Sequence, residues 1–123
     1  MKTIFALCAA VLIAAAVWIY HATRMPNSYG TFTGAQTVAV ADLIARPKDF
    51  LKTTIAVEGV VREQCTAMGC YFFFHEGDKM LRVDIQAVAM TAPRKNGHDT
   101  RVEGRMEPYG DGYQLFASAV EFK

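Results

Sequence analysis

The sequence has no excess of charge of either sign. Its 123 residues include 13 Lys and Arg against 12 Asp and Glu. Lys2 and Arg24 are the only charged residues before residue 25, so residues 25–123 carry a net charge of −1. Proteins that bind nucleic acid usually show a strong basic excess, because contacts to phosphates supply most of their affinity. The balanced charge therefore argues against a nucleic-acid-binding protein.

The sequence also lacks the residue patterns of common enzymes. It has no serine–histidine–acid order, no phosphate-binding glycine loop and no convincing pair of carboxylates. Its three cysteines form no C-x-x-C pair, the spacing that is typical of thiol oxidoreductases and of many zinc sites. We therefore predict a protein without catalytic activity and without a cofactor.

A long uncharged run opens the chain. Residues 3–20 are mostly Leu, Ile, Val and Ala, and they lack the polar face that a soluble surface helix would carry. Such a run predicts a helix that contacts a membrane. Small residues at 14–16 would suit cleavage of a signal peptide, whereas Trp18 and Tyr20 would suit the membrane interface of a retained single-pass anchor. In either case we expect the remainder to be exported, to the periplasmic side of a bacterial inner membrane.

The rest of the chain divides into a linker and a β-domain. We predict the apolar helix over residues 1–23, a linker rich in small and polar residues over 24–36, and the domain over 37–123. One or two helical turns are expected before Pro47. Alternating apolar and polar residues, separated by turn residues, then predict five strands, at 53–63, 71–75, 79–85, 100–107 and 113–122.

Three strands, an irregular connection and two further strands form the order of the OB-fold, a five-stranded Greek-key barrel. Val-Glu-Gly occurs at 57–59 and again at 102–104, and a glycine there lets a long strand bend within a closed sheet. The predicted fold is therefore all-β with a minor helix: an OB-like barrel preceded by the N-terminal hydrophobic helix. An SH3-like barrel is the alternative. We expect Glu58 and Glu103, which precede those glycines, to face solvent.

The stretch VEGVVREQCTAMGCYFFF resembles a group of small exported bacterial OB-fold domain proteins of uncharacterised function. The resemblance covers residues 37–122 and depends on Cys65, on Gly69-Cys70-Tyr71 and on the two Val-Glu-Gly segments. Members often carry tryptophan after the second cysteine, where this chain has Tyr71. The resemblance implies an OB-like fold and an exported location, and it implies no established reaction.

Cys65 and Cys70 flank the turn between the first two predicted strands of the domain. In an oxidising compartment, such a pair favours a disulfide, which would stabilise the fold by roughly 2 kcal/mol. A soft-metal site for copper or zinc is an alternative, with Cys65, Cys70, Met68 and His75 as ligands. A redox-active pair is a further alternative, although such pairs usually begin a helix, and this one lies in a strand–turn–strand segment.

Four consecutive aromatic residues follow the second cysteine. Because side chains alternate along a strand, Phe72 and Phe74 lie on one face, opposite Tyr71 and Phe73. OB-folds bind ligands on the corresponding strands. Cover by the linker or the first helical turns is the alternative. The predicted ligand-binding residues are Tyr71, Phe73, His75, Arg62 and Arg82.

We thus predict a membrane-tethered binding module, whose ligand is a protein, a peptide or a glycan. The soft-metal binding protein and a nucleic-acid-binding OB-fold domain remain the alternatives.

Overall fold

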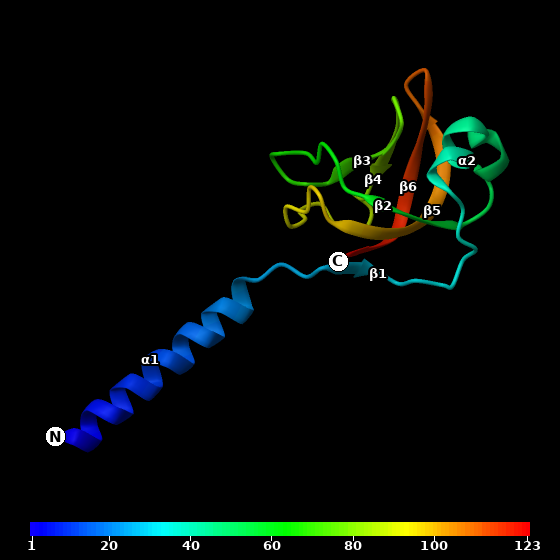
Figure 1. Cartoon of the computed structure of the whole chain (residues 1–123). Helices are drawn as coiled ribbons and strands as arrows, with labels where there is room; N and C mark the ends of the chain where they lie inside the picture. The colour runs from blue at the N-terminus through cyan, green and yellow to red at the C-terminus, as the bar shows by residue number, and fades with distance from the viewer.

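A computed structural model describes the whole chain except the side chain of Thr23. The helix α1 (Lys2–Thr23) projects away from a β-sheet domain (Figure 1). The span Lys2–Ala22 is long and apolar enough to cross a membrane, and none of it is buried against the domain. The structure therefore agrees with the predicted N-terminal helix, and the helix is compatible with a signal sequence or a single-pass anchor.

The predicted strands are present, with shifted ends, and the first helical turns end before Pro47 as expected. After α1, the described elements are β1 (Ser28–Gly30), α2 (Val40–Ala45), the 3-10 helix η1 (Pro47–Phe50), β2 (Ile55–Val60), β3 (Tyr71–Glu76), β4 (Lys79–Asp84), β5 (Asp99–Tyr109) and β6 (Gly112–Phe122).

The described strands form one mixed sheet in the order β2-β5-β6-β4-β3, with β1 paired to β6. The β4–β6 pair is parallel and the other neighbours are antiparallel. Two parts of the predicted fold are corrected. β1 is a sixth strand, and the sheet is not closed by a continuous ladder, because the segment after β2 meets β3 only at an isolated bridge between Arg62 and Phe73. The chain then leaves the strand direction at Glu63, whose φ is 48°.

The core lies on the inner face of this curved sheet. Phe72 and Phe74 point into it, and Leu43 of α2 covers one end. A Cβ atom on Gly59 would lie 2.7 Å from the Phe74 ring, so the glycine lets this ring pack against the backbone of β2. Alternate apolar residues of the first and third predicted strands, at 53–63 and 79–85, are all buried: Ile55, Val57, Val61, Leu81, Val83 and Ile85.

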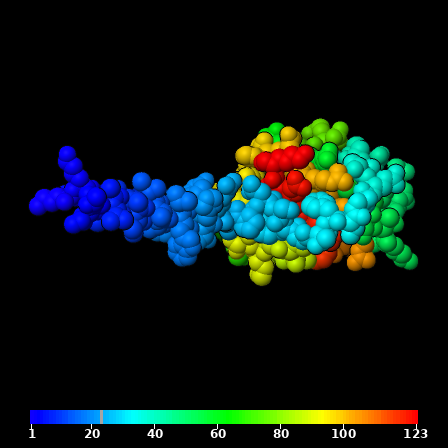
Figure 2. Space-filling view, turned by 90° about the horizontal axis from the view of Figure 1, so that it is seen from below, coloured from blue at the N-terminus to red at the C-terminus, as the bar shows by residue number. Residues whose placement is uncertain are grey.

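Residues 28–35, which the sequence places in the linker, lie against the sheet. β1 pairs antiparallel with β6 from Ser28 opposite Glu121 to Gly30 opposite Ala119. Figure 2 shows the segment after α1 crossing the surface of the domain beside the C-terminal strand. The chain therefore joins the sheet soon after α1 ends.

Glu103 is buried, so the expectation that it faces solvent is wrong. Its carboxylate accepts hydrogen bonds from the backbone N–H groups of Thr33 (2.8 Å), Gly34 (3.1 Å) and Ala35 (3.2 Å), and from the Thr33 hydroxyl (2.8 Å). Burial acts to raise the pKa of this carboxyl, but the hydrogen bonds outweigh burial and the pKa is lowered. The carboxylate thus holds the segment after β1 on the outside of the sheet.

Replacing Glu103 by Gln would remove the charge that these four donors surround. We expect the free energy of unfolding at pH 7 to fall by about 2–3 kcal/mol, measured by chemical denaturation of the full chain in detergent. Because the folded carboxyl has a lowered pKa, its stabilisation is present above the unfolded pKa and is lost as the pH falls through the folded pKa. The difference between the two proteins should therefore shrink in acid.

Glu58→Gln is the matched control, because Glu58 precedes the glycine of the other Val-Glu-Gly segment. Glu58 is exposed and lies 3.1 Å from Arg101. Such surface pairs contribute about 1 kcal/mol or less. Equal losses in the two variants would contradict the role assigned to Glu103.

Candidate functional site: the outer face and the cysteine loop

Strand register places two rows of side chains on the face of the sheet opposite the core. One row follows the pairs Arg62–Phe73 and Phe73–Arg82 across β3 and β4. Both rows continue onto β6 and β5, because β4 pairs with β6 and β6 pairs with β5. We call this surface the outer face, and it consists of Arg62, Phe73, Arg82, Gln114 and Glu107 in one row, Tyr71, Asp84, Phe116 and Arg105 in the other, and Tyr109 at the end of β5.

Arg82 is the centre of the outer face. Its guanidinium carbon lies 4.4 Å from the ring centroids of both Tyr71 and Tyr109. The same group hydrogen-bonds to the side-chain oxygen of Gln114 and lies 3.5 Å from the Asp84 carboxylate. Its side chain is only 17% exposed. Arg82 therefore serves mainly to hold the aromatic rings in place, and little of its charge is accessible to a ligand.

The aromatic residues of the outer face are more accessible. Tyr109 is 50% exposed and Phe116 is 37% exposed. Tyr71 and Phe73 are partly buried, and their rings pack edge to face with centroids 6.2 Å apart. A surface of rings that are held before a ligand arrives loses little conformational entropy on binding.

The structure brings together four of the five predicted ligand-binding residues, namely Arg62, Tyr71, Phe73 and Arg82. His75 lies on β3 nearer to the hairpin, with its ring nitrogen 3.4 Å from the Glu63 carboxylate. The residues that β5 and β6 contribute were not among the predicted ligand-binding residues. Period-two alternation in this hairpin could have marked them, but the pairing of β4 with β6 joins strands that are far apart in sequence.

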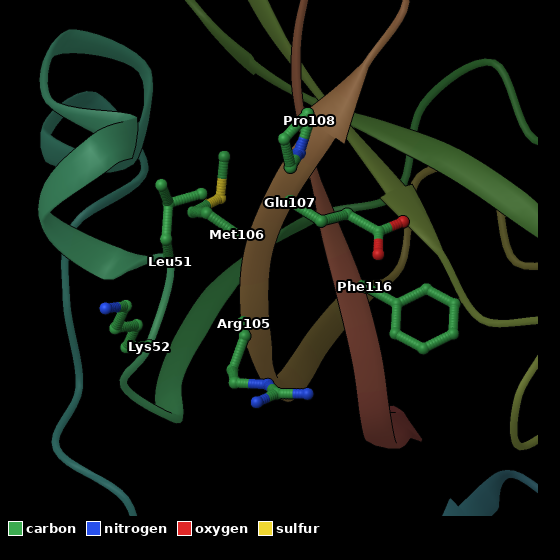
Figure 3. A pocket seen from close by; sticks show the side chains of 7 residues that line it. All are labelled: Leu51, Lys52, Arg105, Met106, Glu107, Pro108 and Phe116. Carbon is green, nitrogen blue, oxygen red and sulfur yellow. The ribbon is translucent and has the colours of Figure 1, made fainter.

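A pocket of about 290 Å³ opens at the edge of β5 beside the outer face. Pairing with β2 ends at Gly104, so the outer edge of β5 beyond it has no strand partner among the described residues. In Figure 3, Met106 points toward Leu51, whereas Glu107 and Phe116 lie on the other side of the strand. The pocket is lined by Leu51, Lys52, Arg105, Met106, Glu107, Pro108 and Phe116.

The loop between β2 and β3 carries the two cysteines. Cys65 is partly exposed, and Cys70 is buried. The Gly69 N–H donates to the Cys65 carbonyl at 3.0 Å. Hydrogen bonding from the backbone of Met68, Ala67 and Gly69, and from the Cys70 side chain, outweighs burial and lowers the pKa of the Cys65 thiol to about 7.

Gln64 holds this cysteine loop in place. Its buried amide nitrogen donates to the carbonyls of Gly69 (3.2 Å) and Pro93 (2.9 Å), and its amide oxygen accepts from the backbone N–H of Lys95 (2.7 Å). Its own backbone N–H donates to the Asn96 side chain at 3.0 Å. No pattern in the sequence marked Gln64, because all but one of these contacts are made to a segment about thirty residues further along the chain.

The predicted site residues of the loop are only partly brought together. Cys65 and Cys70 are adjacent and both are thiols, so their disulfide stays a prediction. Met68 belongs to the same turn, whereas His75 pairs with Glu63. Among the residues that the structure describes, no group of three or more His, Cys, Asp or Glu is arranged to hold a metal ion.

Comparisons with known proteins show the fold alone. No protein-family model and no curated protein matches the chain. The hypothetical protein ygiW from E. coli has a similar structure at 14% identity and a TM-score of 0.50, with 76% of this chain and 99% of that one covered. A protein described as an aspartyl-tRNA synthetase from Leishmania major Friedlin matches at 14% identity and a TM-score of 0.52, with 88% of this chain and 25% of that one covered.

Arg82→Gln tests the stack between the two tyrosines. We expect the free energy of unfolding to fall by about 1–2 kcal/mol, because the variant has no guanidinium to stack on the two tyrosine rings or to pair with Asp84. Arg62→Gln removes the same charge from an exposed position in the same row and should change stability by about 0.5 kcal/mol or less. Chemical denaturation of both variants measures the difference, and equal effects would refute the central role of Arg82.

The thiol of Cys65 should ionise at near-neutral pH. In the reduced chain, we expect its alkylation by iodoacetamide to reach half its maximal rate at about pH 7. Cys70, which is 3% exposed, should react more slowly at every pH. Peptide mapping by mass spectrometry separates the three cysteines. A midpoint for Cys65 close to the ordinary thiol value of 9.0 would show that the turn does not stabilise the thiolate.

Proposed function

We propose that this chain is an exported, membrane-tethered binding module with an OB-like barrel, which takes its ligand on the outer face and catalyses no reaction there. The observation that carries the proposal is the fixed array around Arg82, with two accessible aromatic rings and a pocket beside it. The strand order and the parallel β4–β6 pair support the OB-like assignment. The helix α1 serves as the anchor or the signal, and the domain lies on the periplasmic side.

The ligand that fits this face best is an extended acidic peptide. Arg62, Arg105 and Lys52 are exposed. Among the acidic groups, the Asp84 carboxylate is largely covered beside Arg82, Glu107 is partly buried and accepts from Gln114, and Glu63 is exposed but lies 3.4 Å from the His75 ring. Accessible positive charge therefore exceeds accessible negative charge around the aromatic rings. The unpaired edge of β5 also offers backbone groups to an added strand, a common mode of peptide recognition. Glycans and folded proteins are the other ligands that an exported aromatic face can bind.

A disulfide between Cys65 and Cys70 belongs to the same proposal. It would close the turn immediately before Tyr71, and Tyr71 begins the strand that carries the predicted ligand-binding residues. The Cys65 N–H donates to the Tyr71 carbonyl at 2.9 Å, so the turn and the strand are already joined through the backbone. The covalent bond would keep Tyr71 in position against Arg82.

Binding of labelled probes to the full chain in detergent tests the function. The probes are an extended peptide of alternating Glu and Tyr, its Lys-for-Glu counterpart, and a single-stranded thymidine oligonucleotide. We expect the acidic peptide to bind most tightly. Arg105→Gln should weaken it about tenfold, because loss of one charge-assisted contact of about 1.4 kcal/mol changes affinity by that factor.

Arg101→Gln is the control for Arg105→Gln. It removes the same charge from the same strand, at a position where the arginine pairs with Glu58 at 3.1 Å. Its effect on peptide binding should be small. Equal weakening by the two variants would show nonspecific attraction by charge, and tighter binding of the oligonucleotide would favour the nucleic-acid alternative.

A further inference from the structure

The two sulfurs of the cysteine loop have different surroundings. Cys65 is partly exposed, and its backbone is bonded to both neighbours of Cys70: its N–H donates to the Tyr71 carbonyl at 2.9 Å, and its carbonyl accepts from the Gly69 N–H at 3.0 Å. Cys70 is buried behind it, and the Gln86 side-chain amide donates to its sulfur at 3.6 Å. Thiol–disulfide exchange needs one sulfur that a partner disulfide can reach. It also needs a second, protected sulfur close enough to attack the first.

The loop is also held before any reaction takes place. Besides the contacts of Gln64, the carbonyl of Met68 accepts from the Ala92 N–H at 2.9 Å, and the carbonyl of Cys70 accepts from the Ile85 N–H at 3.0 Å. Arg94 donates to the Thr66 carbonyl at 3.1 Å. Donors fixed in this way stabilise a thiolate without reorganisation of the loop.

Backbone strain lies directly before the loop. Glu63 has a left-handed conformation, with φ of 48°, which is uncommon for residues other than glycine. Strained residues of this kind tend to cluster at functional sites. Here the unusual conformation turns the chain after the bridge at Arg62, and the Cys65 N–H then donates to the Tyr71 carbonyl at 2.9 Å.

We propose that Cys65 and Cys70 form a redox-active pair that exchanges with the disulfides and dithiols of exported partners, with Cys65 as the sulfur that the partner contacts. This inference goes beyond binding on the outer face and does not depend on it. The sequence disfavours a redox role, because no helix is predicted to begin at Cys65. In the structure, hydrogen bonding from the turn over residues 66–69 lowers the pKa of the Cys65 thiol, as a helix N-terminus would.

The exchange proceeds in two steps. The Cys65 thiolate attacks one sulfur of the partner disulfide, a bond forms between them, the partner S–S bond breaks, and its other sulfur leaves as a thiolate. Cys70 then gives its proton to that thiolate and attacks the Cys65 sulfur. The Cys65–Cys70 bond forms, and the second partner sulfur leaves as a thiolate that takes a proton from water. Two electrons pass from the cysteines to the partner, which becomes a dithiol, and the reverse steps oxidise a partner dithiol.

Equilibration of the full chain with glutathione is the first test. The chain, in detergent, is incubated in buffers of increasing ratio of reduced to oxidised glutathione, quenched with acid, alkylated and mapped by mass spectrometry. We expect Cys65 and Cys70 to change together from disulfide to two thiols within this series. A pair that stays oxidised in the most reducing buffer would be an inert staple, and a pair that stays reduced in the most oxidising buffer would not be redox-active. Either result overturns the proposal.

Two single variants test the order of the sulfurs. In Cys70→Ser, oxidised glutathione should trap a stable mixed disulfide on Cys65, because the second sulfur is missing. In Cys65→Ser, the buried Cys70 should react at least about tenfold more slowly, since exchange requires access to the sulfur. Equal rates in the two variants would refute the assigned roles. The glutathione series on the unaltered chain decides the redox claim even if a variant does not fold.

Discussion

The path of the chain between β1 and α2 depends on the buried carboxylate of Glu103. Four hydrogen bonds from Thr33, Gly34 and Ala35 converge on it, and they hold the chain that follows β1 against the sheet. A buried charge without such partners would cost several kcal/mol, so the carboxylate and the segment require each other. Because β1 pairs with β6 only a few residues after α1 ends, a short connection joins the domain to the apolar helix.

The outer face and the cysteine loop follow from the same strand pairing. The bridge between Arg62 and Phe73 brings the end of β2 to β3, and the chain turns at Glu63 into the loop. The loop returns to β3 at Tyr71, whose ring stacks on Arg82. The proposed exchange site and the proposed binding face are thus joined through one residue, so a partner that reaches Cys65 approaches beside the outer face.

Local patterns predicted the strands because alternation and turn residues are properties of short segments. The inward positions of Leu81 and Val83 and the adjacency of the two cysteines follow from such patterns. The burial of Glu103 could not be predicted, because its donors lie about seventy residues earlier in the chain. The role of Gln64 could not be predicted for the same reason, because most of its partners lie about thirty residues later in the chain. β1 was missed because three residues carry too little periodicity to separate a strand from a linker.

We infer that a reactive Cys65 lies on an exported, tethered domain, and labelling in cells tests this directly. Bacterial spheroplasts that express the chain would be treated briefly with a reductant and then with a membrane-impermeant maleimide, with a cytoplasmic cysteine protein as an internal control. We expect Cys65 to be labelled in intact spheroplasts and the control to stay unlabelled, with the labelled chain in the membrane fraction or released on the exported side. Labelling of Cys65 only after lysis would contradict the exported location of a reactive Cys65.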